Sequence, residues 1–421
     1  MRNRALIIQI ALLGCFFHSK AFLKAKIAVQ LDSTILTLRN IQIVDVNKGV
    51  TMSGKEIVIK EGVILKIRRQ RRNLPDGILM DLKGAFIMPG LIDGHVHVTS
   101  PINNNIETTY KHLNYLVTHG VTSVRDAGGD GAALKLAKDE IRKGKRVGPD
   151  IYFSAFLAGD WYYNRDAGIR KEPYFPWEQR LVPGDNLDEA MLKAKSCGAT
   201  GVKLYHSFDA PFLKDIVKAA KNHNLMVWGH SMLYPAKPIE VVQSGVQVLS
   251  HVSMLEVMRK TDDGTFYKRN RPAGYRDSVM ANLNVTNFAR VMKANHAILD
   301  ATICVSVKSD PWVLPLLKRL HQQGVEISAG TDQIVDLMRT YPYLVDELSY
   351  FVMDCGFSNA EALRSATIIA AKVIGQQNNI GLIGKGRRAD LIMMKENPLK
   401  NISALKNLDM VIKSGKILTV K

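Results

Sequence analysis

The sequence predicts an α/β protein, a (β/α)8 TIM barrel with a small β-sandwich domain formed from both chain ends. Three observations support this prediction. Short apolar runs alternate with amphipathic helical patterns through the middle of the chain. Both ends instead show alternating strands that are separated by glycines and polar turns. The length of 421 residues suits one large domain and one smaller one.

The two ends of the chain have the pattern of a single sheet domain. In these segments apolar and polar side chains alternate, as expected for strands with one buried face. The predicted strands are 34–46, 56–69, 80–88, 389–398 and 408–420. We therefore expect residues 26–86 and 381–421 to form a composite β-sandwich domain beside a barrel of residues 87–380.

The central region predicts the eight strands of the barrel. One is the apolar run that precedes His95, and helical patterns such as 210–224 and 312–324 lie between others. The remaining candidate strands are 121–126, 151–155, 201–205, 225–230, 247–251, 301–307 and 325–332. In such barrels the functional side chains lie at the C-terminal ends of the strands. Polar residues at these ends are therefore the candidates for a site.

The first 21 residues have the layout of a secretory signal peptide. Arg2 and Arg4 precede an apolar run of 13 residues, 5–17, and small residues allow cleavage after Ala21. The run is shorter than the roughly 20 residues that a membrane span needs. We expect export to the periplasm or the medium and no stable membrane span after cleavage. A lipoprotein acylated at Cys15 and an uncleaved anchor are the alternatives.

The net charge of +18 raises the question of nucleic-acid binding. Lysine and arginine are scattered, and the densest run, 66–72, falls in a predicted surface hairpin. We therefore expect no nucleic-acid partner and favour attraction to anionic surfaces or substrates.

The cysteines that would remain after signal cleavage carry no pattern of their own. Cys197, Cys304 and Cys355 are widely spaced and odd in number, so they predict neither a disulfide framework nor a C-x-x-C metal site. We expect each to be a small buried apolar side chain.

Several of the predicted barrel strands end in polar residues. In an extended segment alternate side chains share a face, so the two imidazoles of the run "GLIDGHVH" point the same way. Each polar residue follows an apolar run, where burial without a partner would cost several kcal/mol. The set is His95 and His97 after the first strand, Lys203 in the fourth, His230 ending the fifth, His251 ending the sixth and Asp332 ending the eighth. Taken singly each residue suits a structural role, but together they predict one metal site.

The chain resembles the amidohydrolase superfamily in five motifs. In chain order they are "GLIDGHVH", "GVKLYHS", "VWGHSM", "QVLSH" and "SAGTD". The similarity is to its imidazolonepropionase-like and prolidase-like group, and it covers nearly the whole mature chain, including "ADLI" near the C-terminus. Around "VKLYHS" and "WGHSMLYPAKP" the sequence departs from the dipeptidase members, which leaves the substrate open.

The resemblance implies a site for two divalent metal ions. The equivalents of His95 and His97 bind the more buried ion together with Asp332, and those of His230 and His251 bind the second. The equivalent of Lys203 is carbamylated and bridges the two ions. A protonated amine with a pKa of roughly 10 cannot bind a cation, whereas a carbamate offers two oxygens. Imidazole-rich sites favour zinc, with manganese and iron as alternatives.

The resemblance also implies a mechanism and a substrate class. A metal-bridged hydroxide attacks a carbonyl, and the catalytic Asp332 passes its proton to the leaving nitrogen. The preferred substrate is a dipeptide or an N-acyl amino acid, so the chain is expected to be a binuclear hydrolase of carbon–nitrogen bonds. A cyclic amidase of the imidazolone or hydantoin type is the first alternative, and a lactonase or phosphotriesterase is the second, because the same hydroxide attacks esters. A non-enzymatic interaction protein is disfavoured because all six ligand positions are filled.

Two loops after barrel strands are candidates for substrate recognition. Residues 159–186 are rich in tryptophan and tyrosine, and residues 259–278 are rich in arginine and lysine. They suit a lid that recognises a carboxylate-bearing small molecule, or surface loops that pack on the barrel. Tyr205 and His206 are candidate substrate contacts, and Arg125 is expected to be a structural ion-pair partner. A homo-oligomer is compatible with the sequence.

Overall fold

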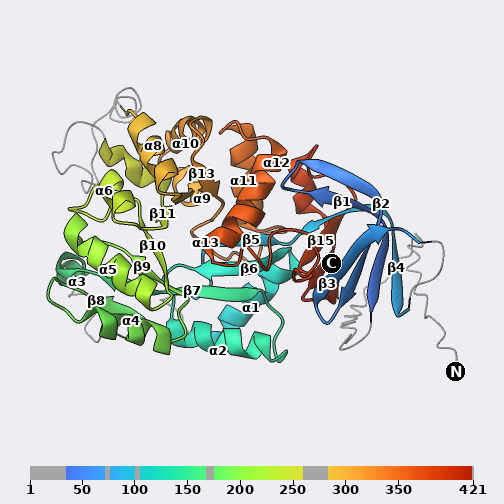
Figure 1. Ribbon diagram of the computed structural model, residues 1–421, viewed down its shortest axis with the longest axis horizontal. Coiled ribbons are helices and arrows are strands. Elements are labelled where there is room, and N and C mark those ends of the chain that lie inside the picture. Colours follow the sequence, from blue (N-terminus) through green and yellow to red (C-terminus); the bar gives the residue numbers. More distant parts are fainter. Residues whose placement is uncertain (1–34, 72–75, 100–104, 167–174, 259–282, 420–421) are drawn as a thin grey trace.

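A computed structural model describes residues 35–71, 76–99, 105–166, 175–258 and 283–419 of the chain. A large barrel and a separate sheet beside it make up the molecule (Figure 1). The predicted signal peptide of residues 1–21 and the basic loop of residues 259–278 lie outside the described residues.

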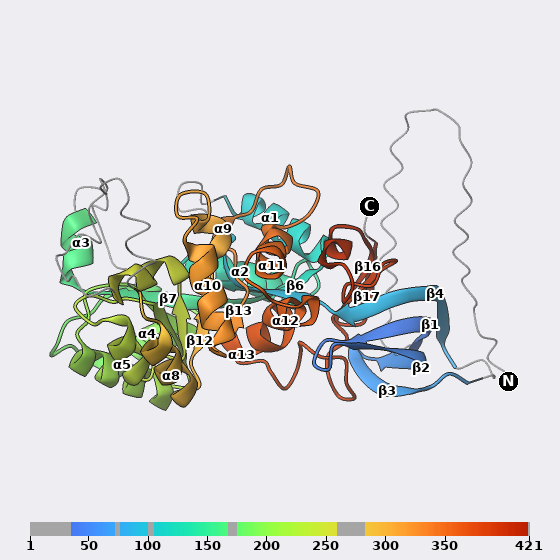
Figure 2. The same cartoon turned by 90° about the horizontal axis from the view of Figure 1, so that it is seen from above.

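Both chain ends contribute to a seven-stranded sheet of order β17-β16-β15-β4-β1-β2-β3. Its strands are β1 (Leu36–Asp45), β2 (Val50–Lys60), β3 (Val63–Arg69), β4 (Ile78–Pro89), β15 (Leu391–Met394), β16 (Leu408–Lys413) and β17 (Lys416–Thr419). The neighbours pair antiparallel except β1 and β4, which are parallel. Alternate apolar side chains of these strands, such as Leu36, Leu38 and Ile57, form their own core. The sheet fits the predicted sandwich domain, and Figure 2 shows β1–β4 at one end of the molecule.

A buried carboxylate stabilises this sheet. Glu56 of β2 is fully buried and accepts hydrogen bonds from Arg39 at 3.1 Å and Arg68 at 2.7 Å. Burial alone would raise the pKa of Glu56, but the hydrogen bonds from Arg68 and Arg39 outweigh it and lower the pKa. The glutamate is therefore ionised in the folded protein.

The second sheet is the barrel, with the order β13-β12-β11-β10-β9-β7-β6-β5-β14 and parallel pairing throughout. The strands are β5 (Leu91–His97), β6 (Val121–Asp126), β7 (Asp150–Ala158), β9 (Gly201–Leu204), β10 (Met226–His230), β11 (Val248–Ser250), β12 (Ile298–Asp300), β13 (Glu326–Ser328) and β14 (Gln333–Ile334). A further short strand, β8 (Glu178–Arg180), pairs with β7. The predicted TIM barrel is confirmed.

The barrel is closed by the last of the predicted strands, which is broken in two. Before the break, β13 pairs with β12, and after it β14 pairs with β5. Between them the amide of Gly94 donates to the carbonyl of Ala329 at 3.1 Å, and the amide of Asp332 donates to the carbonyl of His95 at 2.8 Å. The segment that carries Asp332 therefore lies directly against the segment that carries His95.

Helices follow the barrel strands and surround them (Figure 1). They are α1 (Ile106–Thr118), α2 (Gly131–Arg142), α3 (Asp160–Asp166), α4 (Leu187–Ser196), α5 (Ala210–Asn222), α6 (Pro238–Gln243), η1 (Val252–Met258), α8 (Thr286–Ala294), α9 (Ile303–Ser306), α10 (Val313–Gln322), α11 (Tyr343–Met353), α12 (Asn359–Arg364), η3 (Ser365–Ile369) and α13 (Ala370–Val373). A further short helix, η4 (Ile402–Lys406), lies between β15 and β16 of the terminal sheet. In α5, Asp209 caps the first turn by accepting from the amide of Phe212. Among the described residues no helix is both long and apolar enough to cross a membrane.

One predicted strand is wrong. Residues 301–307 are apolar and partly β-branched, which favours a strand, but the strand of this barrel position is β12, which ends at Asp300. Thr302 then takes a left-handed conformation (φ 50°), and the apolar run continues as the short helix α9. The amides of Ile303 and Cys304 donate to the carboxylate of Glu347 in α11, so a distant side chain caps this helix. Such a long-range cap is invisible in the local pattern.

Candidate metal centre

The first two predicted ligands, His95 and His97, project from the C-terminal half of β5. Their positions are held by Asp93, which is buried and accepts from the amides of His95 and Thr331, each at 3.1 Å. Asp93 also accepts from the hydroxyl of Thr331 at 2.9 Å. A single carboxylate thus joins the first strand of the barrel to the residue before Asp332.

Three imidazoles surround the carboxylate of Asp332. The Nε2 atoms of His95 and His97 lie 3.2 Å and 3.0 Å from its Oδ1. Nδ1 of His251 lies 3.6 Å from its Oδ2. Ligand atoms of His95, His251 and Asp332 all lie within 4.8 Å of one another, which is the spacing of groups that can share a metal ion. The sequence-predicted ligands from β5, from the end of β11 and from the loop before β14 therefore converge.

His230 and Lys203 lie beside this group. The ring centroids of His230 and His251 are 4.8 Å apart. Lys203 is buried inside the barrel, and its charge contributes to lowering the pKa of each of these two histidines. Its Nζ donates to the Ser250 hydroxyl at 2.8 Å. The six predicted residues thus lie at or next to the C-terminal ends of barrel strands, and three of them, His95, His251 and Asp332, meet the spacing of metal ligands.

Burial and neighbouring charges set the protonation of these groups. Burial lowers the pKa of His251 to about 3 and that of His230 well below its ordinary value, so both imidazoles are neutral and able to bind a cation. Burial and the charge of Arg125 lower the pKa of Lys203 to about 7. For Asp332 burial acts in the opposite direction, but His95 and the hydrogen bond from His97 outweigh it and hold the pKa well below its usual value.

Two of the predicted ligands have an unusual backbone. His251 and Asp332 adopt positive φ angles of 75° and 51°. Residues other than glycine rarely take this conformation, and it costs of order 1–3 kcal/mol unless the surroundings impose it. The hydrogen bonds of the Asp332 amide to His95 and of the His251 amide to the Asp300 carbonyl hold the two residues there. Strain at these two positions is typical of a functional site.

A further buried carboxylate at the site was missed in the sequence. Asp300 ends β12 and is fully buried, and its Oδ2 lies 2.7 Å from Nδ1 of His95. Arg125 donates to the same oxygen at 2.7 Å, which confirms the predicted structural ion pair of Arg125 and identifies its partner. Burial would raise the pKa of Asp300, but His95 and Arg125 outweigh it and hold the pKa at about 2. The sequence pattern places the end of this strand at residue 307, seven residues beyond Asp300. Asp300 therefore does not stand out in the sequence as a strand-terminal residue.

The candidate substrate contacts lie in an aromatic group next to His230. The ring of Tyr205 is 4.1 Å from that of His230, measured between centroids. His206 stacks on Trp161 of α3, with centroids 4.4 Å apart and ring planes inclined by 23°. Tyr162 of α3 also contacts Tyr205, at 4.9 Å. Two aromatic side chains of the loop predicted at 159–186, Trp161 and Tyr162, therefore pack against the candidate substrate contacts.

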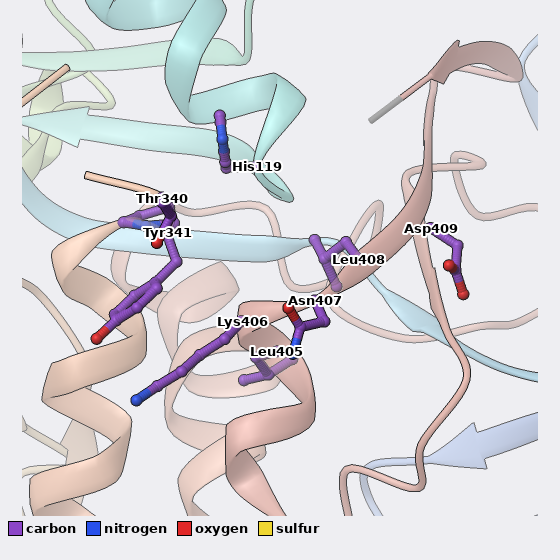
Figure 3. Close-up of a pocket in the computed structure, with 9 residues that line it drawn as sticks. His119, Thr340, Tyr341, Leu405, Lys406, Asn407, Leu408 and Asp409 are labelled. Atoms are coloured by element: carbon purple, nitrogen blue, oxygen red, sulfur yellow. The ribbon is translucent and has the colours of Figure 1, made fainter. Parts of the chain in front are cut away.

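A cavity of about 540 Å³ lies elsewhere, between α1, the start of α11 and the η4–β16 connection (Figure 3). His119, Tyr341 and Lys406 are among its lining residues, and the six predicted ligands are not. The ammonium of Lys406 lies 4.7 Å from the centroid of the Tyr341 ring. This cavity is separate from the candidate metal centre.

The residues present suit divalent metal ions. Four imidazoles, one ionised carboxylate and a buried amine form the donor set, and imidazole nitrogen with carboxylate oxygen is the ligand chemistry of zinc and related transition metals. The side chain of His95 is 1% exposed, whereas that of His97 is 31% exposed, so the group has a buried side and an open side. Such a centre admits a small molecule from one direction.

Comparison with known proteins gives consistent matches across the chain. A family model for the amidohydrolase family matches residues 86–418. Ochratoxinase from Aspergillus niger is 24% identical over 388 residues, which cover 79% of this chain and 75% of the ochratoxinase. Adenine deaminase 1 from Latilactobacillus sakei is 23% identical over 331 residues, which cover 76% of this chain. The match spans 47% of that deaminase, about half its length.

Solved structures share the fold. A Xaa-Pro dipeptidase with bound methionine has a TM-score of 0.73 at 23% identity, over 92% of this chain and 100% of the dipeptidase. A prolidase complexed with N-methylphosphonate-L-proline has a TM-score of 0.71 at 22% identity, with the same coverage of both chains. The predicted family is confirmed by the match over residues 86–418, and the chain belongs to the amidohydrolase family of metal-dependent enzymes.

Proposed function

We propose that the protein hydrolyses the amide bond of a dipeptide or an N-acyl amino acid at a centre of two divalent metal ions, with zinc as the metal. The ligands would be His95, His97, Lys203, His230, His251 and Asp332. The observation that carries the proposal is the placement of Asp332, whose Oδ1 lies within 3.2 Å of two imidazole nitrogens from β5 while its Oδ2 faces His251. An ionised carboxylate beside several imidazole nitrogens is an arrangement that attracts a cation between them.

Lys203 would join the two halves of the centre as a carbamate. In this reaction Nζ attacks the carbon of CO2, a nitrogen–carbon bond forms, and one proton leaves to water. The amine must first be unprotonated, which a pKa of about 7 allows at neutral pH. The carbamate nitrogen keeps one hydrogen, so the hydrogen bond to Ser250 can persist and fix the direction of the two new oxygens.

When bound, paired divalent cations would supply a water-derived nucleophile near neutral pH and would polarise the scissile carbonyl. The role of Asp332 follows from its position and its charge. Its carboxylate is ionised and 18% exposed, so it can accept a proton from the attacking water at one Oδ atom and return it to the leaving nitrogen. A protonated amine leaves far more readily than an amide anion.

The aromatic group would form one wall of the substrate site. Tyr205 lies directly against His230, and Trp161 stacks on His206 while keeping 44% of its surface exposed. Flat apolar surfaces of this kind bind an acyl group or an apolar side chain. We also propose that the basic residues of the predicted lid, 259–278, recognise a carboxylate on the substrate. These residues lie outside the described residues, so this part of the proposal rests on the sequence. Export to the periplasm or the medium is proposed on the N-terminal sequence pattern.

A substrate screen tests the proposal. Protein purified with zinc and bicarbonate would be assayed against dipeptides, N-acyl amino acids, cyclic amides and lactones, before and after treatment with a chelator. We expect chelator-sensitive hydrolysis of the first two classes, and hydrolysis slower by about 100-fold or more with Asp332→Asn, which controls for contaminating hydrolases. Preference for cyclic amides or lactones would overturn the substrate class, and hydrolysis unaffected by metal removal would overturn the metal mechanism.

A further inference from the structure

Three hydrogen-bond donors converge on one oxygen of Asp300. Its Oδ2 accepts from Nδ1 of His95 at 2.7 Å, from the Arg125 guanidinium at 2.7 Å and from the Ser250 hydroxyl at 2.9 Å. Its other oxygen, Oδ1, has no hydrogen-bond partner among the described residues. Asp300 is fully buried and is not one of the predicted metal ligands. One carboxylate oxygen of Asp300 therefore binds His95, Arg125 and Ser250 together.

We propose that Asp300 is a positioning residue that fixes the tautomer and the orientation of His95, so that Nε2 of this histidine is presented to the metal. The inference rests on the proposed function. A neutral imidazole has one N–H donor and one acceptor nitrogen. When Nδ1 donates to Asp300, the proton is held on that side of the ring and the lone pair of Nε2 faces Asp332 and the metal position.

The same carboxylate reaches the opposite side of the centre through Ser250. The Ser250 hydroxyl donates to Asp300, and its oxygen accepts from Nζ of Lys203 at 2.8 Å. Ser250 and Asp300 are paired in register at the C-terminal ends of β11 and β12. One short hydrogen-bonded chain therefore links the two side chains that flank the proposed metal pair, Lys203 and His95.

The position of Asp300 is set by tight packing as well as by hydrogen bonds. A methyl group on Gly330 would collide with Oδ1 of Asp300 and would lie 2.7 Å from Cβ of His95. Arg125 further holds the region together, because it also donates from Nε to the carbonyl of Gly94, next to His95. Asp300 cannot move away from His95 without disturbing its packing against Gly330 and its hydrogen bond from Arg125.

The competing explanation is that Asp300 only neutralises Arg125, which is itself fully buried. The two roles predict different results for metal binding. If Asp300 serves only as a counter-charge, its loss lowers thermal stability but leaves the metal affinity of the folded protein unchanged. If it positions His95, its loss weakens the affinity itself.

The test is cobalt(II) binding to the metal-free full chain, followed by equilibrium titration and by the visible d–d absorption spectrum. For Asp300→Asn we expect an affinity about 10- to 100-fold weaker and an altered spectrum in the folded protein. Glu347→Gln is the matched control, because Glu347 is an equally buried carboxylate that caps α9. This control should lose stability and keep the wild-type affinity.

A second variant keeps the test valid if Asp300→Asn does not fold. Arg125→Met combined with Asp300→Asn removes both charges, so no unpaired buried arginine remains, and it should show the same weakened affinity. Wild-type affinity and spectrum in a folded Asp300 variant would overturn the positioning role. Failure of the wild-type protein to bind cobalt would instead overturn the proposed metal centre, so the two failures are distinguishable.

Discussion

Nε2 of His97 lies 3.0 Å from Oδ1 of Asp332, although 235 residues separate them in the chain. This contact joins β5, the first strand of the barrel, to the segment between β13 and β14 that closes the barrel. His97 and Asp332 are also the more exposed members of the contact group, with 31% and 18% of their side-chain surface accessible. They therefore face the side from which a substrate would approach.

The first prediction concerns proton transfer by Asp332. Asp332→Asn keeps the shape of the side chain, so the fold and the circular dichroism spectrum should be unchanged. The amide cannot accept the proton that the ionised carboxylate accepts, so kcat should fall by about 100-fold or more. Steady-state kinetics on the best substrate of the screen measures this change. Near-normal turnover by the folded variant would remove Asp332 from proton transfer.

The second prediction concerns the second metal ion. Lys203→Ala removes the only side chain proposed to bridge the two ions, so metal content should fall from two ions per chain to one or fewer, and most activity should be lost. Elemental analysis after dialysis measures the content. Lys195→Ala, a change of an exposed lysine in α4, is the control and should retain two ions. Equal metal content in the two variants would contradict the bridging role.

The third prediction concerns the close approach at Gly330. Gly330→Ala forces its new methyl group against Asp300 and His95, so it should weaken cobalt binding and lower the melting temperature. Gly384→Ala is a suitable control, because the nearest atoms to the added methyl group belong to the flexible Arg387 side chain, at 3.3 Å or more. A Gly330→Ala variant with wild-type stability and affinity would show that this packing does not position the two residues.

The fourth prediction concerns the terminal sheet and is independent of the metal site. Glu56→Gln leaves Arg39 and Arg68 without their buried counter-charge, and it should destabilise the protein by about 1–3 kcal/mol at neutral pH. Because the pKa of Glu56 is lowered by folding, its ionised form stabilises the protein above the ordinary value of 4.5. That contribution is lost as the pH falls through the lower pKa of the folded state.

The measurement for Glu56 is the urea midpoint of wild type and variant across the acidic range. The difference between them should be largest near neutral pH and should shrink below about pH 4.5, the ordinary value for the carboxyl group. Glu189→Gln, an exposed change in an i,i+4 pair of α4, should have little effect at any pH. A pH-independent difference for Glu56→Gln would contradict the proposed ion pair.

The fold could be predicted because its signals are local. Alternating strands at both ends and apolar runs with helices between them follow from burial of one face of each element. The convergence of His95, His251 and Asp332 was also predictable, because residues at the C-terminal ends of parallel barrel strands meet at one end of the barrel.

The features that could not be predicted depend on contacts between distant segments. The helix α9 was mistaken for a strand because its N-terminal amides are capped by Glu347, 44 and 43 residues away from Ile303 and Cys304. The true strand end, Asp300, was missed as a consequence, and with it the partner of His95. The break between β13 and β14, which gives Asp332 its positive φ, is likewise set by hydrogen bonds to β5 and not by the local sequence.

The most direct test of the account is anomalous X-ray diffraction at the zinc edge, from crystals of the full chain grown with zinc and bicarbonate. We expect two peaks at the open end of the barrel. One should lie about 2.0–2.2 Å from ligand atoms of His95, His97 and Asp332, and the other at the same range from His230 and His251. Density for a carbamate on Lys203 should connect the two peaks. Peaks remote from these six residues, or none at all, would contradict the central claim.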